Sequence, residues 1–316
     1  MSIKNKMTKQ NKIAVILTTY GSPATLDDIP AYLKRIYGGN DADEEVIIEF
    51  RRRYTLIGGS PLVKITQAQA SALEIALNKN AKQVFTVSAG MRFSHPFIDE
   101  VVQRTIADVD QIIGIIMSPQ YSPIIMNGYI KELKEAVSKF PRKNIKLTIA
   151  EDWHLQPYFI QALAEKVKEA IEKHPKDVQK DLPILFSAHS MPKRVIEKEP
   201  DYINHLKETA AATAKLLNLN DDQWMFCYQS AGHTPEEWLK PDFADIMPEL
   251  QKSGKKYVLI APVQFLSDHL EILYDVGIGA KEQAEEHGIT FARTESLNTS
   301  PLFIQALAEV TKKLSI

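Results

Sequence analysis

The sequence predicts an α/β fold of two similar doubly wound lobes, each with a four-stranded parallel sheet flanked by helices. Two observations predict it. Short β-branched runs alternate with longer segments of helical periodicity along all 316 residues, which is typical of parallel sheets covered on both faces. The chain also repeats itself: residues 157–165 return as 301–309, and the tripeptide at 88–90 returns at 230–232. The sequence therefore indicates a duplicated four-strand unit.

The individual elements follow from residue type and periodicity. β-branched and aliphatic residues gather in eight runs that predict strands, at 13–19, 83–88, 112–117, 145–150, 183–188, 224–228, 256–262 and 289–293. Apolar residues between them recur at helical intervals, which predicts helices such as 64–78, 97–108, 127–139, 157–173, 201–217 and 268–286. Folds of this kind bind ligands beyond the carboxyl ends of their strands, so we expect a cleft there between the lobes.

We place an N-terminal Rossmann-like lobe at 10–150 and a C-terminal Rossmann-like lobe at 151–299, and we expect a last helix, about 300–316, to pack on the first lobe. The formal net charge of −2 lacks the basic excess of nucleic-acid binders. One cysteine, Cys227, excludes an internal disulfide framework and a multi-cysteine metal site. Apolar runs such as 112–117 are shorter than the ~20 residues of a membrane-spanning helix. We expect a cytoplasmic protein without a membrane span.

Candidate functional groups stand at the ends of predicted strands. Tyr20 and His189 end two of them, and Glu271 lies at the start of a predicted helix after a third. A phenol, an imidazole and a carboxylate that meet in a cleft can bind a metal ion or move protons. Position alone also allows a packed aromatic ring, a hydrogen-bonded strand end and a carboxylate favoured by the helix dipole. Asp275, on the same predicted face as Glu271, either extends a carboxylate track for a cation or is solvated.

Three further segments allow more than one interpretation. Ser267 and Asp268 stand where they can cap the helix that carries Glu271. The arginines at 51–53 precede a Gly-Gly turn and can bind carboxylates or phosphates, or form a solvated helix face. The turn lacks the spacing and the lysine of a P-loop, which disfavours a nucleotide site. The polar loop at 229–235 can line a large flat ligand or form a simple turn.

Several motifs together resemble the ferrochelatase family. Residues 186–192, Phe-Ser-Ala-His-Ser-Met-Pro, are similar to the family motif around its metal-binding histidine. Residues 267–274, Ser-Asp-His-Leu-Glu-Ile-Leu-Tyr, are similar to its second signature, and 53–62, 119–122 and 228–241 resemble further family segments in the expected order. The resemblance runs from about residue 13 to the C-terminus. It implies a chelatase-like fold and a lyase that inserts ferrous iron into a porphyrin in haem biosynthesis.

The resemblance also implies roles for particular residues. His189 would bind the incoming iron and take a pyrrole proton, while Glu271 would face it across the porphyrin as the opposite proton acceptor or metal guide. A tyrosine at position 20 resembles the axial iron ligand of the coproporphyrin ferrochelatases of Gram-positive bacteria, which favours coproporphyrin III over protoporphyrin IX. Asp275 would offer a second metal site. The matching porphyrin-binding positions are Tyr20, Arg35, Arg53, Ser60 and Tyr129.

Three positions depart from the family pattern. Residues 34–35 read Lys-Arg where coproporphyrin members often carry an arginine pair, so we expect Arg35 to substitute in anchoring a propionate. Lys240 replaces a glycine before a proline, and Gly279 replaces an acidic residue two turns after Glu271. These departures bear more on the choice of substrate than on the reaction.

The implied mechanism is base-assisted metal insertion. A closing cleft puckers one pyrrole, which exposes its nitrogen to iron and its proton to the neutral imidazole of His189. We expect Fe²⁺ as a substrate, no obligatory cofactor, no iron–sulfur cluster, a monomer, and at most transient contacts with haem-pathway enzymes. The alternatives are a tetrapyrrole carrier that binds haem through Tyr20 and does not need Glu271, a chelatase for another metal or ring, and an unrelated two-lobed binder.

Overall fold

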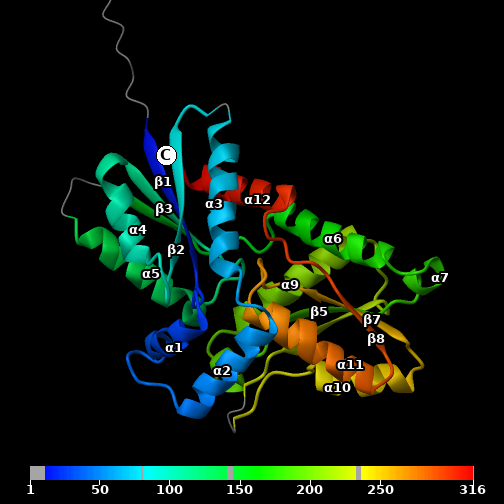
Figure 1. The fold of residues 1–316 in the computed structure, drawn as a ribbon. Helices are drawn as coiled ribbons and strands as arrows, with labels where there is room; N and C mark the ends of the chain where they lie inside the picture. Colours follow the sequence, from blue (N-terminus) through cyan, green and yellow to red (C-terminus); the bar gives the residue numbers. More distant parts are fainter. Residues whose placement is uncertain (1–10, 80, 141–144, 233–235, 316) are drawn as a thin grey trace, which may run out of the picture.

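The structure, a computed structural model, describes residues 11–79, 81–140, 145–232 and 236–315, and its strands form two sheets (Figure 1). The N-terminal sheet has the order β2-β1-β3-β4 and the C-terminal sheet the order β6-β5-β7-β8, with every neighbouring pair parallel. The first sheet contains β1 (Lys12–Thr19), β2 (Val84–Met91), β3 (Gln111–Ile116) and β4 (Lys146–Ala150). The second contains β5 (Ile184–His189), β6 (Trp224–Gln229), β7 (Tyr257–Pro262) and β8 (Thr290–Arg293).

The predicted fold class is confirmed, and each predicted strand is present with its ends within one residue, apart from β2. That strand continues to Met91, three residues past its predicted end, and stays paired with β1 as far as Thr19. Residues 89 and 90 of the extension are alanine and glycine, which lack the β-branched side chains that predict a strand. Gly90 is small for a reason: a Cβ there would come within 3.2 Å of the Ile98 Cα of the helix that packs on the strand.

The helices connect the strands and cover both faces of each sheet. Those of the first half are α1 (Ile29–Ile36), α2 (Glu44–Leu56), α3 (Leu62–Asn78), α4 (Ile98–Thr105) and α5 (Pro123–Ser138), with the 3₁₀ turns η1 (Leu26–Asp28) and η2 (Ile106–Asp108). Those of the second half are α6 (Pro157–Glu172), α7 (Lys176–Gln179), α8 (Lys193–Ile196), α9 (Pro200–Leu216), α10 (Phe243–Lys252), the π-helix η3 (Glu271–Ala280), α11 (Lys281–Glu286) and α12 (Pro301–Leu314). Within the described ranges, no helix is long and apolar enough to cross a membrane.

Alternate residues of each strand enter different hydrophobic clusters. In β1, Val15 joins Leu73 of α3 on one face of the sheet, while Ile16 joins Val102 of α4 and Leu133 of α5 on the other. In the second sheet, β5 and β7 bury one face against α6 and α9 and the other against α10 and η3. Burial on both faces explains the near-continuous apolar character of the strands.

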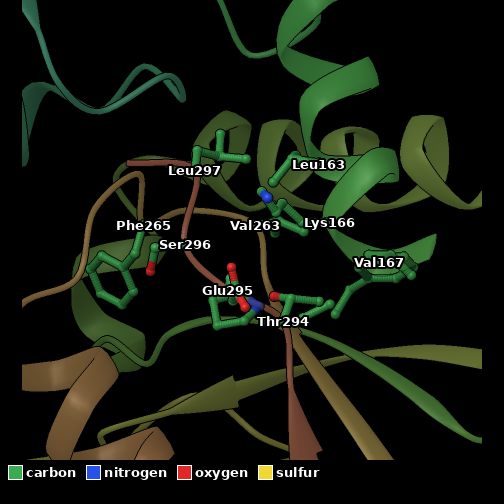
Figure 2. Close-up of a pocket in the computed structure, with 12 residues that line it drawn as sticks. Leu163, Lys166, Val167, Val263, Phe265, Thr294, Glu295, Ser296 and Leu297 are labelled. Carbon is green, nitrogen blue, oxygen red and sulfur yellow. The ribbon is translucent and has the colours of Figure 1, made fainter. Parts of the chain in front are cut away.

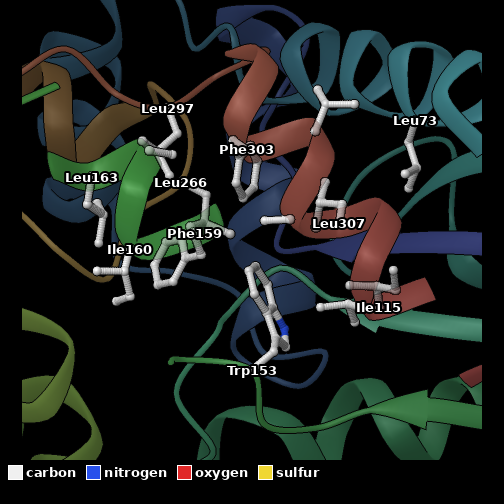
Figure 3. Packing of buried hydrophobic residues seen from close by; sticks show 14 of the residues in the cluster. Leu73, Ile115, Trp153, Phe159, Ile160, Leu163, Leu266, Leu297, Phe303 and Leu307 are labelled. Atoms are coloured by element: carbon white, nitrogen blue, oxygen red, sulfur yellow. The ribbon is translucent and has the colours of Figure 1, made fainter. Parts of the chain in front are cut away.

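The two repeated segments form α6 and α12, which pack against each other at the centre of the molecule. α6 follows the first sheet along the chain but lies against α9 and β7 of the second lobe. α12 follows the second sheet but lies against α3, β3 and β4 of the first lobe. Trp153 lies near both, with ring centroids 5.4 Å from Phe159 of α6 and 6.3 Å from Phe303 of α12 (Figure 3). The lobes therefore share one continuous hydrophobic core, to which each contributes its last helix.

Candidate active site

A cavity of about 960 Å³ lies where the carboxyl ends of both sheets meet. In each sheet the second strand in the chain lies on one side of the first strand, and the third lies on the other side. α/β folds place ligands at this switch point, where the strand order reverses. The volume is at the upper end of the ~300–1,000 Å³ typical of small-molecule sites. The predicted site residues that line it are Tyr20, Arg53, Ser60, Tyr129, His189, Glu271 and Asp275. Two strand ends and the start of a π-helix thus supply the three groups expected to do chemistry.

Arg35 is not brought to this cavity. The apolar face of α1 buries Leu33, and Arg35 lies on the exposed side of the same helix. Its guanidinium carbon lies 4.2 Å from the centroid of the Phe97 ring, a cation–π contact. The structure therefore gives no support for propionate anchoring by Arg35. Of the polar loop expected at 229–235, residues 229–232 line the cavity, and 233–235 lie outside the described residues.

His189 is held in one orientation at the end of β5. Its backbone N–H donates to Gln264 Oε1 at 2.9 Å, and its ring Nδ1 contacts the backbone carbonyl oxygen of Ser190. A carbonyl oxygen only accepts, so we infer that Nδ1 carries the proton. In the neutral ring the lone pair is then on Nε2, the nitrogen nearest to Glu271, and is available to a metal ion or a proton.

Glu271 begins the π-helix η3, and its carboxylate meets the His189 ring. Glu271 Oε2 lies 3.4 Å from His189 Nε2, yet this buried oxygen has no hydrogen-bond partner among the described residues. The expectation that the two residues face each other across a porphyrin is wrong for this arrangement. A flat ring between two groups requires about 7 Å, two van der Waals contacts. Both side chains lie on one wall of the cavity because β5 ends beside the loop that leads into η3.

The predicted helix caps have a different role. The π-helix has no side-chain cap, and Ser267 Oγ instead accepts from Gln69 Nε2 at 2.8 Å. The Asp268 carboxylate accepts from Ser296 Oγ and Asn298 Nδ2, both at 2.9 Å. These bonds fix the loop before Glu271 to both lobes. π-Helical segments are rare and concentrate at functional sites, which fits the position of this one.

Asp275 and Arg53 form the next layer of the same wall. An Arg53 guanidinium nitrogen, Nη1, lies 3.6 Å from Asp275 Oδ1, and Arg53 Nε lies 2.7 Å from Glu49. Burial raises the pKa of the Asp275 carboxyl, the Glu271 carboxylate adds to the increase, and Arg53 opposes it. Asp275 is thus an ion-paired wall residue rather than a solvated one.

Tyr20 faces the cavity from the opposite lobe. Its ring packs 4.5 Å from Phe93 and 6.4 Å from Tyr32, centroid to centroid, while 40% of the residue stays exposed. Desolvation of the phenol, followed by the charge of Glu271, raises the pKa of Tyr20 to about 12. The phenol therefore remains protonated at neutral pH in the ligand-free cleft. It provides a polar atom beside two packed aromatic rings.

Sequence reasoning missed residues that support this site. Gln264 holds the backbone of His189, and its Nε2 donates to Tyr202 OH at 2.6 Å. Tyr32 also lines the cavity, and its hydroxyl donates to the Gly21 carbonyl oxygen at 3.0 Å. The repeat offered a signal for Gln264, because Gln120 occupies the matching place after the third strand of the first lobe.

A second, much smaller cavity of about 10 Å³ lies between α6 and the segment after β8 (Figure 2). Leu163 and Lys166 of α6 line it together with residues 294–297. Its volume holds about one water molecule at most. It is not a ligand site.

Comparisons with known proteins show the family of the chain and agree with its fold. The ferrochelatase family model matches residues 12–314. The ferrochelatase of Herpetosiphon aurantiacus is 38% identical over 301 residues, covering 95% of this chain and 98% of that protein. The coproporphyrin III ferrochelatase of Oceanobacillus iheyensis is 34% identical, covering 96% and 97%. Among solved structures, SirB from Bacillus subtilis with Fe³⁺ superposes with a TM-score of 0.58 over 96% of both chains, at 10% identity that shows the fold alone. The chain belongs to the ferrochelatase family, the lyases that act as metal chelatases.

Proposed function

We propose that this protein inserts Fe²⁺ into coproporphyrin III in preference to protoporphyrin IX. The observation that carries the reaction is the pair formed by His189 and Glu271. An imidazole lone pair and a carboxylate oxygen face each other 3.4 Å apart without a hydrogen bond between them. Two electron-rich atoms at that distance are separated as adjacent ligands of one metal ion are, with bonds of about 2.0–2.2 Å. The pair therefore suits a cation or a proton.

Binding of a cation and binding of a proton are both needed for porphyrin metallation. Iron insertion requires a group that presents Fe²⁺ to the ring and a base that removes the pyrrole N–H protons. His189 Nε2 is the base, because its lone pair points into the cavity while Nδ1 is fixed on Ser190. Glu271 stabilises the imidazolium that forms, and both groups coordinate Fe²⁺ as it arrives. Since both lie on one wall, the porphyrin lies beside the pair, with Tyr20 on the wall of the other lobe.

The protons need a route away from the ring. Asp275 lies beyond Glu271 on the π-helix, and burial raises the pKa of its carboxyl. A carboxylate of raised basicity accepts a proton more readily from its neighbours. Arg53 lies on the far side of Asp275. We infer that Glu271 and Asp275 relay protons outward after His189 has taken them.

Two features support coproporphyrin III as the ring. Coproporphyrin carries propionates where protoporphyrin IX carries vinyl groups, so a guanidinium on the cavity wall favours it. Arg53 lines this cavity, and its guanidinium carbon lies 5.0 Å from the Tyr274 ring centroid, in position to exchange a protein carboxylate for a propionate. Tyr20 supplies the phenol expected of an axial ligand in the coproporphyrin type. The Oceanobacillus relative is also named for this substrate.

We further propose that the enzyme works as a cytoplasmic monomer, with only transient contacts to other haem-pathway enzymes and no resident cofactor. Cys227, the one cysteine of the sequence, is buried, and burial raises the pKa of its thiol. A thiol in that state is a poor metal ligand and a poor partner for disulfide exchange. This property fits a reducing compartment and a function without an iron–sulfur cluster.

The test is a comparison of anaerobic Fe²⁺ insertion into coproporphyrin III and protoporphyrin IX, followed by the change in porphyrin absorbance. We expect kcat/KM for coproporphyrin III to be about ten-fold higher or more, the equivalent of one charge-assisted contact. Equal rates would refute the preference and leave the reaction intact. Haem binding without metallation of either ring would instead show a carrier.

The role of Glu271 is tested in the same assay with Glu271→Gln. We expect the insertion rate to fall about 10²–10⁴-fold, the usual contribution of a positioned acid–base group. Glu282→Gln, on the exposed side of α11, is the matched control and leaves the rate unchanged. An unaffected Glu271→Gln enzyme would contradict the assigned role.

A further inference from the structure

A cluster of two imidazoles and two carboxylates lies outside the active-site cavity, at the junction of the lobes. We call it the His154 cluster; it comprises Asp152, His154, His205 and Glu208. Asp152 and His154 lie on the segment between β4 and α6, and His205 and Glu208 lie on α9. None of the four is among the described residues that line the cavity.

His154 is buried, yet carboxylates occupy both sides of its ring. Nδ1 lies 2.6 Å from Asp152 Oδ1, and Nε2 lies 2.8 Å from Glu208 Oε2. A neutral imidazole donates only one hydrogen bond, so it cannot satisfy both carboxylates. The site therefore demands one additional positive charge, which either a proton or a metal ion can supply.

The second imidazole shows which of the two fits better. The ring of His205 stacks on that of His154, with centroids 4.2 Å apart and planes 20° apart. Its Nδ1 is buried without a hydrogen-bond partner in the described structure, an arrangement that costs about 1–3 kcal/mol. A proton on His154 leaves that nitrogen unsatisfied, whereas a metal ion accepts electron pairs from both rings.

The donor atoms are close enough for one ion. One ligand atom each from Asp152, His154 and His205 lies within 4.8 Å of the other two. Ligands of a tetrahedral ion with bonds of ~2.1 Å lie about 3.4 Å apart, so binding requires the donor atoms to close up. The His205 ring must also turn out of its stack on His154, because the in-plane lone pairs of nearly parallel rings do not converge on one ion. The Asp152 side chain is 45% exposed and free to move closer. Glu208 remains as a fourth ligand or as the hydrogen-bond acceptor that metal-bound histidines usually have.

We propose that the His154 cluster binds a divalent transition-metal ion of the Zn²⁺ class, which joins the β4–α6 segment to α9. Two imidazoles with carboxylates favour such borderline ions over Mg²⁺ and Ca²⁺, which prefer oxygen ligands alone. The site is distinct from the one that handles the substrate iron. Because α6 also packs against α9, the ion stiffens the junction from which the C-terminal lobe begins.

The experiment is a calorimetric Zn²⁺ titration of the purified full-length protein and its variants. His154 is buried and its replacement can unfold the chain, so the working variants are His205→Gln and Asp152→Asn. We expect each to lose about one equivalent of Zn²⁺ or to bind it about ten-fold more weakly or worse. His287→Ala, at the end of α11, is the matched control and keeps the wild-type stoichiometry.

Two additional readouts separate this site from the active site. Zn²⁺ should raise the Tm of the wild type more than that of His205→Gln, because only the former has an ion linked to folding. Fe²⁺ insertion by His205→Gln should stay within about two-fold of wild type, since the residue lies outside the cavity. Equal Zn²⁺ stoichiometry and equal Tm responses in wild type and His205→Gln would overturn the proposal, as would Mg²⁺ binding as tightly as Zn²⁺.

Discussion

The two lobes have the same strand order but end their first strands in different chemistry. β1 ends beside Tyr20, a phenol packed among aromatic rings, whereas β5 ends in His189, an imidazole with one nitrogen fixed and the other facing Glu271. Both ends lie at the switch point of their sheet and line one cavity. The two lobes thus have equivalent strand ends, and the proposed function assigns a wall for the ring to one and a base to the other.

The difference continues along the chain after the third strand of each lobe. The offset that relates Gln120 to Gln264 places Asn127 opposite Glu271 and Lys131 opposite Asp275. Lys131 is solvated, and its Nζ lies 3.8 Å from Glu135 Oε1. Asp275 instead lines the cavity and forms an ion pair with Arg53. The first lobe therefore has an ordinary α-helix where the second has a π-helix lined with carboxylates.

Removal of the functional group at each of the two strand ends should give the largest effect and is the strongest test of this comparison. His189→Ala should reduce Fe²⁺ insertion about 10³-fold or more, because it removes both a base and a metal ligand. Tyr20→Phe, at the matching strand end, should retain insertion within about ten-fold, the scale of one lost ligand contact. Single-turnover rates measure both, with porphyrin binding followed by fluorescence. Near-normal turnover in His189→Ala would remove the distinction between the lobes.

The shared core provides a test in which the lobes should behave alike. Phe159 and Phe303 occupy matching places in the repeat and are both fully buried. Each replacement by alanine should lower the free energy of unfolding by about 3–5 kcal/mol. Urea denaturation measures the loss, with Ile75→Ala on the exposed face of α3 as the control. Costs that differ by more than about half of that range would show that one lobe depends on the core more than the other.

The two glutamines should separate support of catalysis from support of the fold. Gln264→Leu removes the acceptor of the His189 backbone N–H and should lower kcat about 10–100-fold. Gln120 bonds instead to Thr209 Oγ1 and the Val263 carbonyl oxygen of the other lobe, at 3.1 and 3.3 Å. Gln120→Leu should cost about 1–3 kcal/mol of stability with kcat little changed. Parallel thermal melts and rate assays distinguish these effects, and equal rate losses would contradict them.

The smallest expected effect concerns the carboxylate of Asp275, which is replaced by a lysine at the matching place in the first lobe. The pKa of Asp275 is raised in the folded state, so its protonated form stabilises the fold at low pH, and this contribution is lost as pH rises through the folded pKa. Asp275→Asn should therefore raise stability at neutral pH, on the order of 1 kcal/mol. The gain should disappear near the ordinary aspartate pKa of about 4. Tm measured against pH tests this, and a gain that persists at low pH would refute it.

Much of the fold could be predicted because its signals are local. Alternating strand and helix patterns and the repeat at 157–165 and 301–309 specify two parallel sheets. The expected lobe boundaries already assign 157–173 to the second lobe and the last helix to the first, although the same apolar face suits either sheet. The helical pattern of α2 is weak because it mixes charged and apolar residues, with Tyr54 its one buried residue.

The site was predictable in its residues but not in its geometry. His189, Glu271 and Tyr20 stand at strand and helix ends, and the resemblance singles them out. That His189 and Glu271 share one wall depends on the π-helical start of η3 and on the bonds of Asp268 to Asn298, which involve residues distant in sequence. Arg35 does not line the cavity, because α1 buries the face that carries Leu33 and this rotation leaves Arg35 on the exposed side. Which face is buried depends on tertiary packing that the local sequence does not show.

The exchange of the repeated helices has a consequence for biosynthesis. The sheet of the first lobe buries one face under α12, and the Gln111 side chain donates to the Leu314 carbonyl oxygen near the end of the chain. On the ribosome, the first half therefore keeps an uncovered apolar face until α12 has been synthesised. Emergence of α12, rather than synthesis of the first lobe, sets the moment at which that lobe can mature.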